Sequence, residues 1–100
     1  MKRRFEWDER KAVGNLRKHG VTFWEAVTIF HDPCILSRYD DEHSDTEDRW
    51  VVLGESERSR LLVVIQVILE QDEDSEVVRI LSARKATRRE SDIYHLRRPL

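Results

Sequence analysis

The chain has few of the residues that build disulfides, flexible linkers or membrane spans. One cysteine in 100 residues allows no internal disulfide, and this usage favours a reducing cytoplasm. Three glycines and two prolines leave no low-complexity linker. The longest apolar run, Leu61 to Ile65, is too short to cross a membrane, and Met1-Lys2-Arg3-Arg4 leads into no signal-peptide apolar stretch. We therefore expect one domain, residues 1–100, in the cytoplasm and without a membrane partner.

Several catalytic signatures are also missing. The chain contains neither a glycine-rich nucleotide-binding loop nor the Gly-x-Ser-x-Gly turn of serine hydrolases. Its four histidines are scattered, and no two of them have the helical spacing of a metal site. The acidic loop 40–48 lacks the glycine and the final glutamate of a calcium-binding EF-hand loop. We expect no metal and no cofactor.

Charge is divided unevenly along the chain, although the net charge is only −2. Residues 1–20 hold seven Lys/Arg against three Asp/Glu, and residues 79–100 hold seven against two. Residues 21–78 hold four against fifteen. This asymmetry predicts that the two termini build a basic surface suited to a polyanion such as RNA. A set of solvated faces without a partner is the simpler alternative.

Periodicity and capping residues predict an α+β domain with the order β-α-α-β-β-β-β-α. Asp8 and Gly20 delimit the first helix, and Thr22 with Glu25 forms a capping box for the second. A small antiparallel sheet of about four to five strands follows, then a last helix from Thr87 to about Arg98. The five N-terminal aromatic residues are expected in the core rather than as base-stacking platforms: Phe5, Trp7, Phe23, Trp24 and Phe30.

The segment from Arg79 to Glu90 is the most informative part of the chain. It joins an apolar strand, a basic turn and a helix start, where Thr87 and Glu90 form another capping box. A charged arginine is uncommon in a buried strand, so its presence in a predicted strand requires an explanation. An exposed face of the sheet or an ion pair is the simplest explanation. Since Arg79 and Arg84 differ by an odd number, a regular strand points them to opposite faces, and we prefer Arg84 for a site.

A functional explanation for these arginines is a role in cleaving a phosphodiester without a metal. It needs a base for the 2′-hydroxyl, fixed positive charge for the transition state and an acid for the 5′-oxygen. Arginine suits the second role because its fork matches phosphate and stays charged, and histidine serves as acid or base near neutral pH.

Many of these residues, in order and spacing, resemble the BrnT family of bacterial toxins. The resemblance covers nearly the whole chain and rests on Phe5-Glu6-Trp7-Asp8, Lys11, Asn15, Lys18 to Ala26, Phe30, Asp32-Pro33, His43-Ser44, Glu47, Arg49, Gly54, Ser56, Arg60, Arg79 to Thr87, Glu90 and Tyr94. It implies a RelE-like fold and a metal-independent endoribonuclease of a type II toxin–antitoxin pair. It also implies a BrnA-type antitoxin that binds the toxin and carries the contact with operator DNA.

Within that resemblance we assign candidate roles. The expected catalytic residues are Arg84 and Arg60 as phosphate ligands and His43 as acid or base, with Glu47 and Arg49 as weaker candidates. The expected RNA-binding residues are Lys18, His19, Arg79, Lys85 and Arg88. Helix capping is the simpler role for Lys18 and His19, and exposure in a loop is an even alternative for His43.

A non-enzymatic module that acts with its antitoxin as a co-repressor is the competing hypothesis. Such a module would carry a helix whose side chains read bases. The last helix lies too close to the chain end to belong to an obvious helix-turn-helix.

Overall fold

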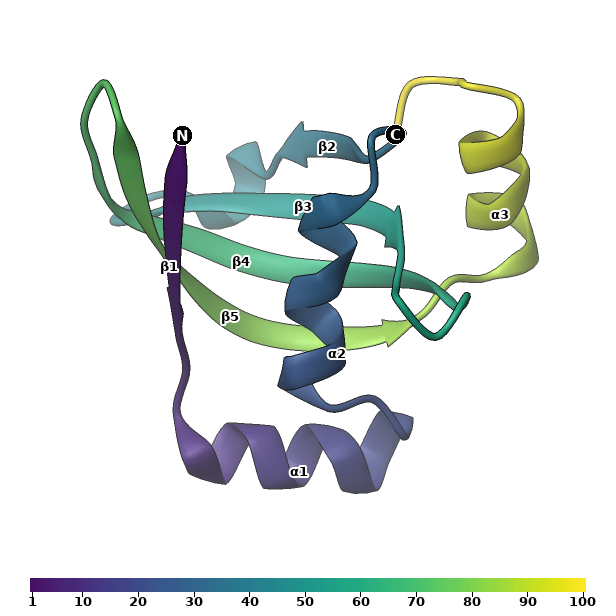
Figure 1. Ribbon diagram of the computed structural model, residues 1–100, viewed down its shortest axis with the longest axis horizontal. Coiled ribbons are helices and arrows are strands. Elements are labelled where there is room, and N and C mark those ends of the chain that lie inside the picture. The colour runs from purple at the N-terminus through teal and green to yellow at the C-terminus, as the bar shows by residue number, and fades with distance from the viewer.

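Five strands form one sheet in the order β1-β5-β4-β3-β2, and the computed structural model describes all residues from 1 to 100 (Figure 1). The strands are β1 (Lys2–Glu6), β2 (Leu36–Tyr39), β3 (Asp48–Glu55), β4 (Leu61–Gln71) and β5 (Ser75–Lys85). The helices are α1 (Glu9–His19), α2 (Phe23–Thr28) and α3 (Arg88–His95), with 3-10 turns η1 (Ile29–His31) and η2 (Asp41–His43). The α+β class and the element order are confirmed. None of the helices is long and apolar enough to span a membrane.

The sheet is mixed rather than wholly antiparallel. Strands β2 to β5 pair antiparallel, but β1 pairs parallel with β5, with Arg4 opposite Val77 and Glu6 opposite Arg79. A parallel neighbour needs a crossover rather than a hairpin, and the connection from β1 to β5 runs through α1, α2 and the other three strands. The pairing places the basic strand β1 beside residues 75–79 of β5, so Arg79 is the one member of the basic C-terminal segment that pairs with it.

The helix ends follow local chemistry. The Asp8 carboxylate accepts from the Lys11 backbone N–H at 3.1 Å, and Gly20 closes α1 in the left-handed conformation with φ 70°. The Thr22 hydroxyl accepts from the Glu25 backbone N–H at 3.0 Å. The reciprocal half of that capping box is missing, because the Glu25 carboxylate pairs with Arg60 instead.

Both halves of the capping box at Thr87 and Glu90 are formed. The helix they begin is shorter than predicted, because α3 ends at His95 and Arg97 has a positive φ of 56°. Its Tyr94 hydroxyl donates to the Asp32 carboxylate at 2.6 Å, which ties α3 to the segment after η1.

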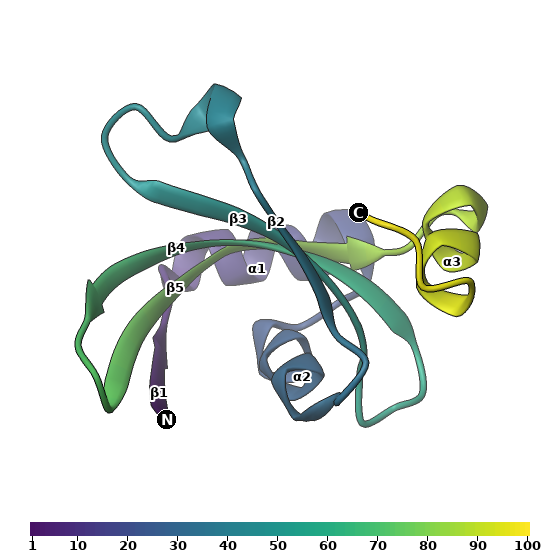
Figure 2. The same ribbon diagram turned by 90° about the horizontal axis from the view of Figure 1, so that it is seen from above.

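Two apolar clusters lie on opposite faces of the sheet. Phe23, Ala26 and Ile29 pack on one face, against a cluster that includes Val52, Leu62, Val64, Ile80 and Ala83. The α3 residue Tyr94 packs on the other face, with Val51, Leu53 and Val63. Figure 2 shows α2 below the sheet, α3 at one end, and the tip of the β2–β3 hairpin rising on the side away from α2. Between that tip and α3, the second face carries no helix.

Candidate functional site

A β-bulge in β5 decides which arginines share a face. Ile65 pairs with Ser82 but Gln66 pairs with Ile80, so Leu81 is an extra residue in β5. Ile80 and Ala83 therefore both face α2 despite their odd separation. Arg79 and Arg84 accordingly share the opposite face, which corrects the expectation from a regular strand.

Four arginines from three strands lie on this face, and we call Arg38, Arg49, Arg79 and Arg84 the cationic face. Residues opposite each other in a ladder point the same way. Arg49, Val67 and Arg79 form one row across β3, β4 and β5, and Arg38 lies in the next row, opposite Val51. Arg84 lies opposite Val63, which precedes Val67 by four residues in β4. At the rise of a strand, the row of Arg84 is therefore about 13 Å from the row of Arg49 and Arg79.

The four side chains differ in how far they are already neutralised. Both Arg84 terminal nitrogens donate to the Glu90 carboxylate, at 2.7 and 2.9 Å. This pair lowers the pKa of Glu90 to about 2 and raises that of Arg84. Arg79 has only a loose ion pair with Glu6, at 3.8 Å between two half-exposed side chains. Arg38 and Arg49 have no ion pair within 4.0 Å, and the buried Nε of Arg49 has no hydrogen-bond partner.

The segment that carries Asp40 and His43 is bonded to the backbone of Arg49. The Asp40 backbone N–H donates to the Arg49 carbonyl at 2.8 Å, and the Ser44 hydroxyl accepts from the Arg49 N–H at 3.0 Å. These bonds hold η2 against β3. His43 Nδ1 lies 2.9 Å from the Asp40 carboxylate, and its side chain is 58% exposed. Only one ring nitrogen is engaged, so Nε2 is available to another molecule.

The nearby arginines as well as His43 affect the pKa of the Asp40 carboxylate. Desolvation by itself would raise its pKa, but the hydrogen bond from His43 and the charges of His43, Arg38 and Arg49 outweigh that effect. The net result is a pKa below its usual value. Asp40 therefore stays ionised at neutral pH, and as a carboxylate it fixes the orientation of the His43 ring.

Arg60 lies elsewhere. Its Nε donates to Glu25 Oε2 at 2.8 Å, a terminal nitrogen binds the second carboxylate oxygen, and that nitrogen also donates to the Gly20 carbonyl at 3.2 Å. The Ser56 hydroxyl donates to Glu25 Oε2 at 2.7 Å. Because α2 covers the other face of the sheet, this arrangement separates Arg60 from the cationic face. It ties the β3–β4 turn to α2.

The remaining candidate residues surround the sheet rather than meeting at one point. Glu47 is exposed in the β2–β3 loop, near the end of β4. Lys18 and His19 close α1, which contacts β5 through Asn15 and the Ala83 backbone. Ala83 faces α2, so these two residues lie away from Arg84. Lys85 and Arg88 are exposed, at the end of β5 and the start of α3.

Sequence reasoning missed two features of the site, Arg38 and the Asp40–His43 pair. Arg38 was visible as a charged residue in a predicted strand, but its row could not be known without the register. The pairing of Asp40 with His43 had a local signal, because a three-residue separation in one turn brings the two side chains together. No group of three or more His, Cys, Asp or Glu side chains lies close enough to hold a metal ion.

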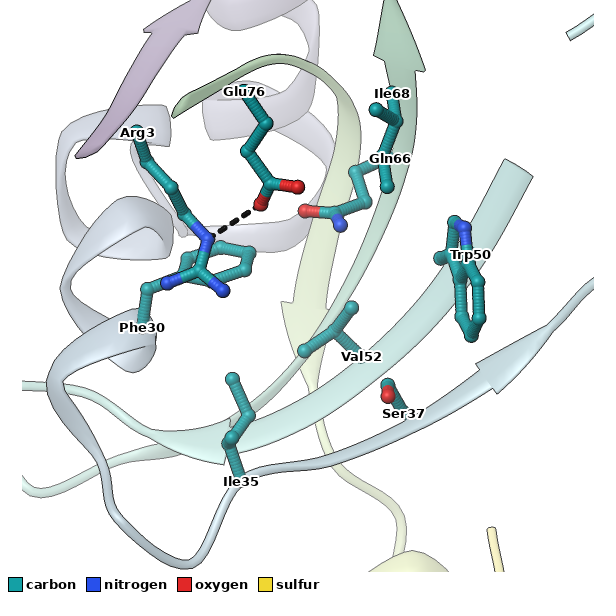
Figure 3. A pocket seen from close by; sticks show the side chains of 9 residues that line it. All are labelled: Arg3, Phe30, Ile35, Ser37, Trp50, Val52, Gln66, Ile68 and Glu76. Atoms are coloured by element: carbon teal, nitrogen blue, oxygen red, sulfur yellow. Dashed lines mark hydrogen bonds and ion pairs between the residues drawn. The ribbon is translucent and has the colours of Figure 1, made fainter. Parts of the chain in front are cut away.

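The face covered by α2 has its own pocket at the end away from α3 (Figure 3). Arg3 Nε donates to Glu76 Oε1 at 2.6 Å, and the guanidinium carbon lies 5.4 Å from the centre of the Phe30 ring. Gln66 points into this pocket from β4, and its buried Oε1 has no hydrogen-bond partner. The pocket carries balanced charge, so it lacks the net positive character of the cationic face.

An α+β fold with four arginines on one face of its sheet presents a positive surface of the kind that suits nucleic acid phosphates. The family model described as "Ribonuclease toxin, BrnT, of type II toxin-antitoxin system" matches residues 7–90, so the chain belongs to this family of toxins. It is similar in fold to the crystal structure of the Brucella abortus ribonuclease toxin BrnT, with a TM-score of 0.56 and 21% sequence identity. That similarity covers 88% of this chain and 100% of the Brucella chain. No curated protein matches the chain.

Proposed function

We propose that the protein is a metal-independent endoribonuclease that cleaves RNA in the cytoplasm and stops translation until a BrnA-type antitoxin neutralises it. The observation that carries the proposal is Arg49, an arginine without a carboxylate partner beside an Asp-oriented histidine. Membership of the ribonuclease toxin family supports this activity. Operator DNA is contacted only through the antitoxin.

The arrangement fits the requirements of RNA cleavage. A His43 ring that donates Nδ1–H to Asp40 keeps a lone pair on Nε2, which can take the proton of a 2′-hydroxyl as that oxygen bonds to phosphorus. The imidazolium so formed can return the proton to the 5′-oxygen as the bond from phosphorus to that oxygen breaks. Arg49 supplies fixed positive charge for the phosphorane-like transition state, and its planar fork matches two phosphate oxygens. Arg38 and Arg79 extend the positive surface for flanking phosphates. Arg84, already paired with Glu90, serves at the far end of the same face.

The first experiment is induced expression of the chain alone in bacteria, with growth and total RNA followed over time. Arg49→Ala should abolish growth arrest and lower the cleavage rate of the purified protein about 10²–10³-fold, the usual effect of losing one preorganised donor. Arg49→Lys should recover only part of the rate. Arg58→Ala is the matched control, because Arg58 is an exposed arginine in the β3–β4 turn, outside the cationic face.

A folded Arg49→Ala protein that stays fully toxic would remove Arg49 from the mechanism. Normal growth and intact RNA with folded wild-type protein would overturn the ribonuclease proposal. If that inactive protein retains operator DNA without an antitoxin in a gel-shift assay, the co-repressor hypothesis takes its place.

A further inference from the structure

The surface of α1 and α2 exposes apolar side chains in one place. Val13, Leu16 and Trp24 are 56%, 48% and 73% exposed, and all three line the same shallow groove, together with Trp7. We call these four residues the α1–α2 groove. The sequence predicted Trp24 in the core, and this prediction is wrong. A tryptophan left this exposed beside other apolar side chains marks a surface that another molecule covers.

Packing between aromatic rings holds the groove in place. The Trp24 and Trp7 rings meet edge to face, with their centres 4.8 Å apart, and Trp7 packs in turn against the buried Phe23 at 5.9 Å. The Trp7 Nε1–H donates to Glu9 Oε1 at 3.2 Å. A large aromatic surface that is already ordered loses little conformational entropy when a partner binds, as in the energetic centres of protein interfaces.

The charge around the groove selects the partner. Arg10 and Arg17 lie three residues before and four residues after Val13, so they flank it on the exposed side of α1. Both arginines are exposed, and neither has an ion pair. A second copy of the chain would bring the same positive charge to the interface. An acidic partner gains attraction where a copy meets repulsion.

We propose that the α1–α2 groove docks an amphipathic helix of the antitoxin, which places apolar side chains against Leu16 and Trp24 and acidic side chains near Arg10 and Arg17. The naming of the antitoxin rests on the proposed function. Figure 1 shows that α1, which carries Val13 and Leu16, lies apart from α3. The antitoxin therefore anchors away from Arg84, and the anchor leaves its remaining chain free to reach the arginines of the cationic face.

The test measures binding of the purified cognate antitoxin by calorimetry, with a thermal melt of each variant to verify folding. Leu16→Glu should weaken binding at least 100-fold, because it removes apolar contact and repels an acidic helix. Leu16→Lys should bind at least 10-fold more tightly than Leu16→Glu. Trp24→Ala should weaken binding at least 10-fold, and Leu96→Glu, at a 60% exposed apolar residue after α3, should bind like wild type.

Equal affinity of wild type, Leu16→Glu and Trp24→Ala for the antitoxin would overturn the docking surface. If Leu16→Lys binds as weakly as Leu16→Glu, the acidic character of the partner helix is wrong. A wild-type chain that binds no antitoxin overturns the docking surface together with the proposed partner. Cleavage of RNA by the wild-type toxin alone tests the ribonuclease activity separately from these results.

Discussion

Replacing Arg60 by alanine should lower the stability of the folded protein, and not only its activity. The Glu25 carboxylate is 4% exposed and is held by two bonds from Arg60 and one from Ser56. In Arg60→Ala the carboxylate stays buried with Ser56 as its only close donor. Arg58 cannot replace the lost charge, because its nearest nitrogen lies 3.8 Å away on a side chain that is 67% exposed.

Breaking a buried ion pair by removing one partner costs about 3–5 kcal/mol. The Arg60 side chain is 24% exposed, so we expect the lower end, about 3 kcal/mol of unfolding free energy. At roughly 4–8 °C per kcal/mol for a domain of this size, the melting temperature should fall by about 12–24 °C. The hydrogen bond from Arg60 is the main cause of the lowered Glu25 pKa, so this stabilisation is present above about pH 4.5 and is lost as the pH falls further.

Thermal melting followed by tryptophan fluorescence measures the effect. Arg58→Ala is the matched control, since it removes the looser partner of the same carboxylate and should cost less than about 1 kcal/mol. Adding Glu25→Gln to Arg60→Ala should recover part of the loss, because no buried charge then remains unpaired. An Arg60→Ala protein that melts within about 2 °C of wild type would refute this reasoning, and loss of RNA cleavage in that stable protein would return Arg60 to the catalytic candidates.

Two further substitutions test how the helices are attached to the sheet. The buried Asn15 side chain donates to the Val21 and Ala83 carbonyls at 2.9 and 2.8 Å and accepts from the Ala83 N–H at 3.0 Å. Asn15→Ala should therefore lower the free energy of unfolding, measured in urea, by about 3 kcal/mol. A loss below about 1 kcal/mol would contradict this prediction. Glu90 has a pKa of about 2 in the folded protein, so its contribution is complete above about pH 4.5 and disappears as the pH falls toward 2. Glu90→Gln should therefore flatten the stability profile between those pH values, and an unchanged profile would show that the Arg84–Glu90 pair does not stabilise α3.

Most helices and strands could be predicted from residues close together in the sequence. The caps at Asp8, Gly20 and Thr87 were read from single residues and their near neighbours, and each is formed. The strand order along the chain followed from short apolar runs between polar turns. The capping box at Thr22 failed because of a distant residue, since Arg60 binds the Glu25 carboxylate that would complete it. The last helix ends at His95, before the predicted Arg98, and Arg97 has a positive φ.

The candidate site was predictable in its residue types and not in its arrangement. Arginine in strands predicts a phosphate-binding surface. Of the arginines that this reasoning selects, Arg49, Arg79 and Arg84 share the cationic face, and Arg60 pairs with Glu25 away from it. The bulge at Leu81 then reversed the expected relation between Arg79 and Arg84, since one inserted residue changes which side chains share a face. Only the ladder register showed that Arg38 joins them.

The sequence by itself determined the α+β class, the helix boundaries marked by caps, and the separation of basic termini from an acidic middle. Capping, helical periodicity and strand alternation involve residues close together in the chain, so they can be recognised from the sequence alone. The tertiary structure decided that β1 lies parallel beside β5, that four arginines share one face, that Arg60 serves a buried carboxylate, and that Trp24 stays outside the core. Each of these depends on which residues from distant parts of the chain meet, and that is fixed by packing and register rather than by local preference.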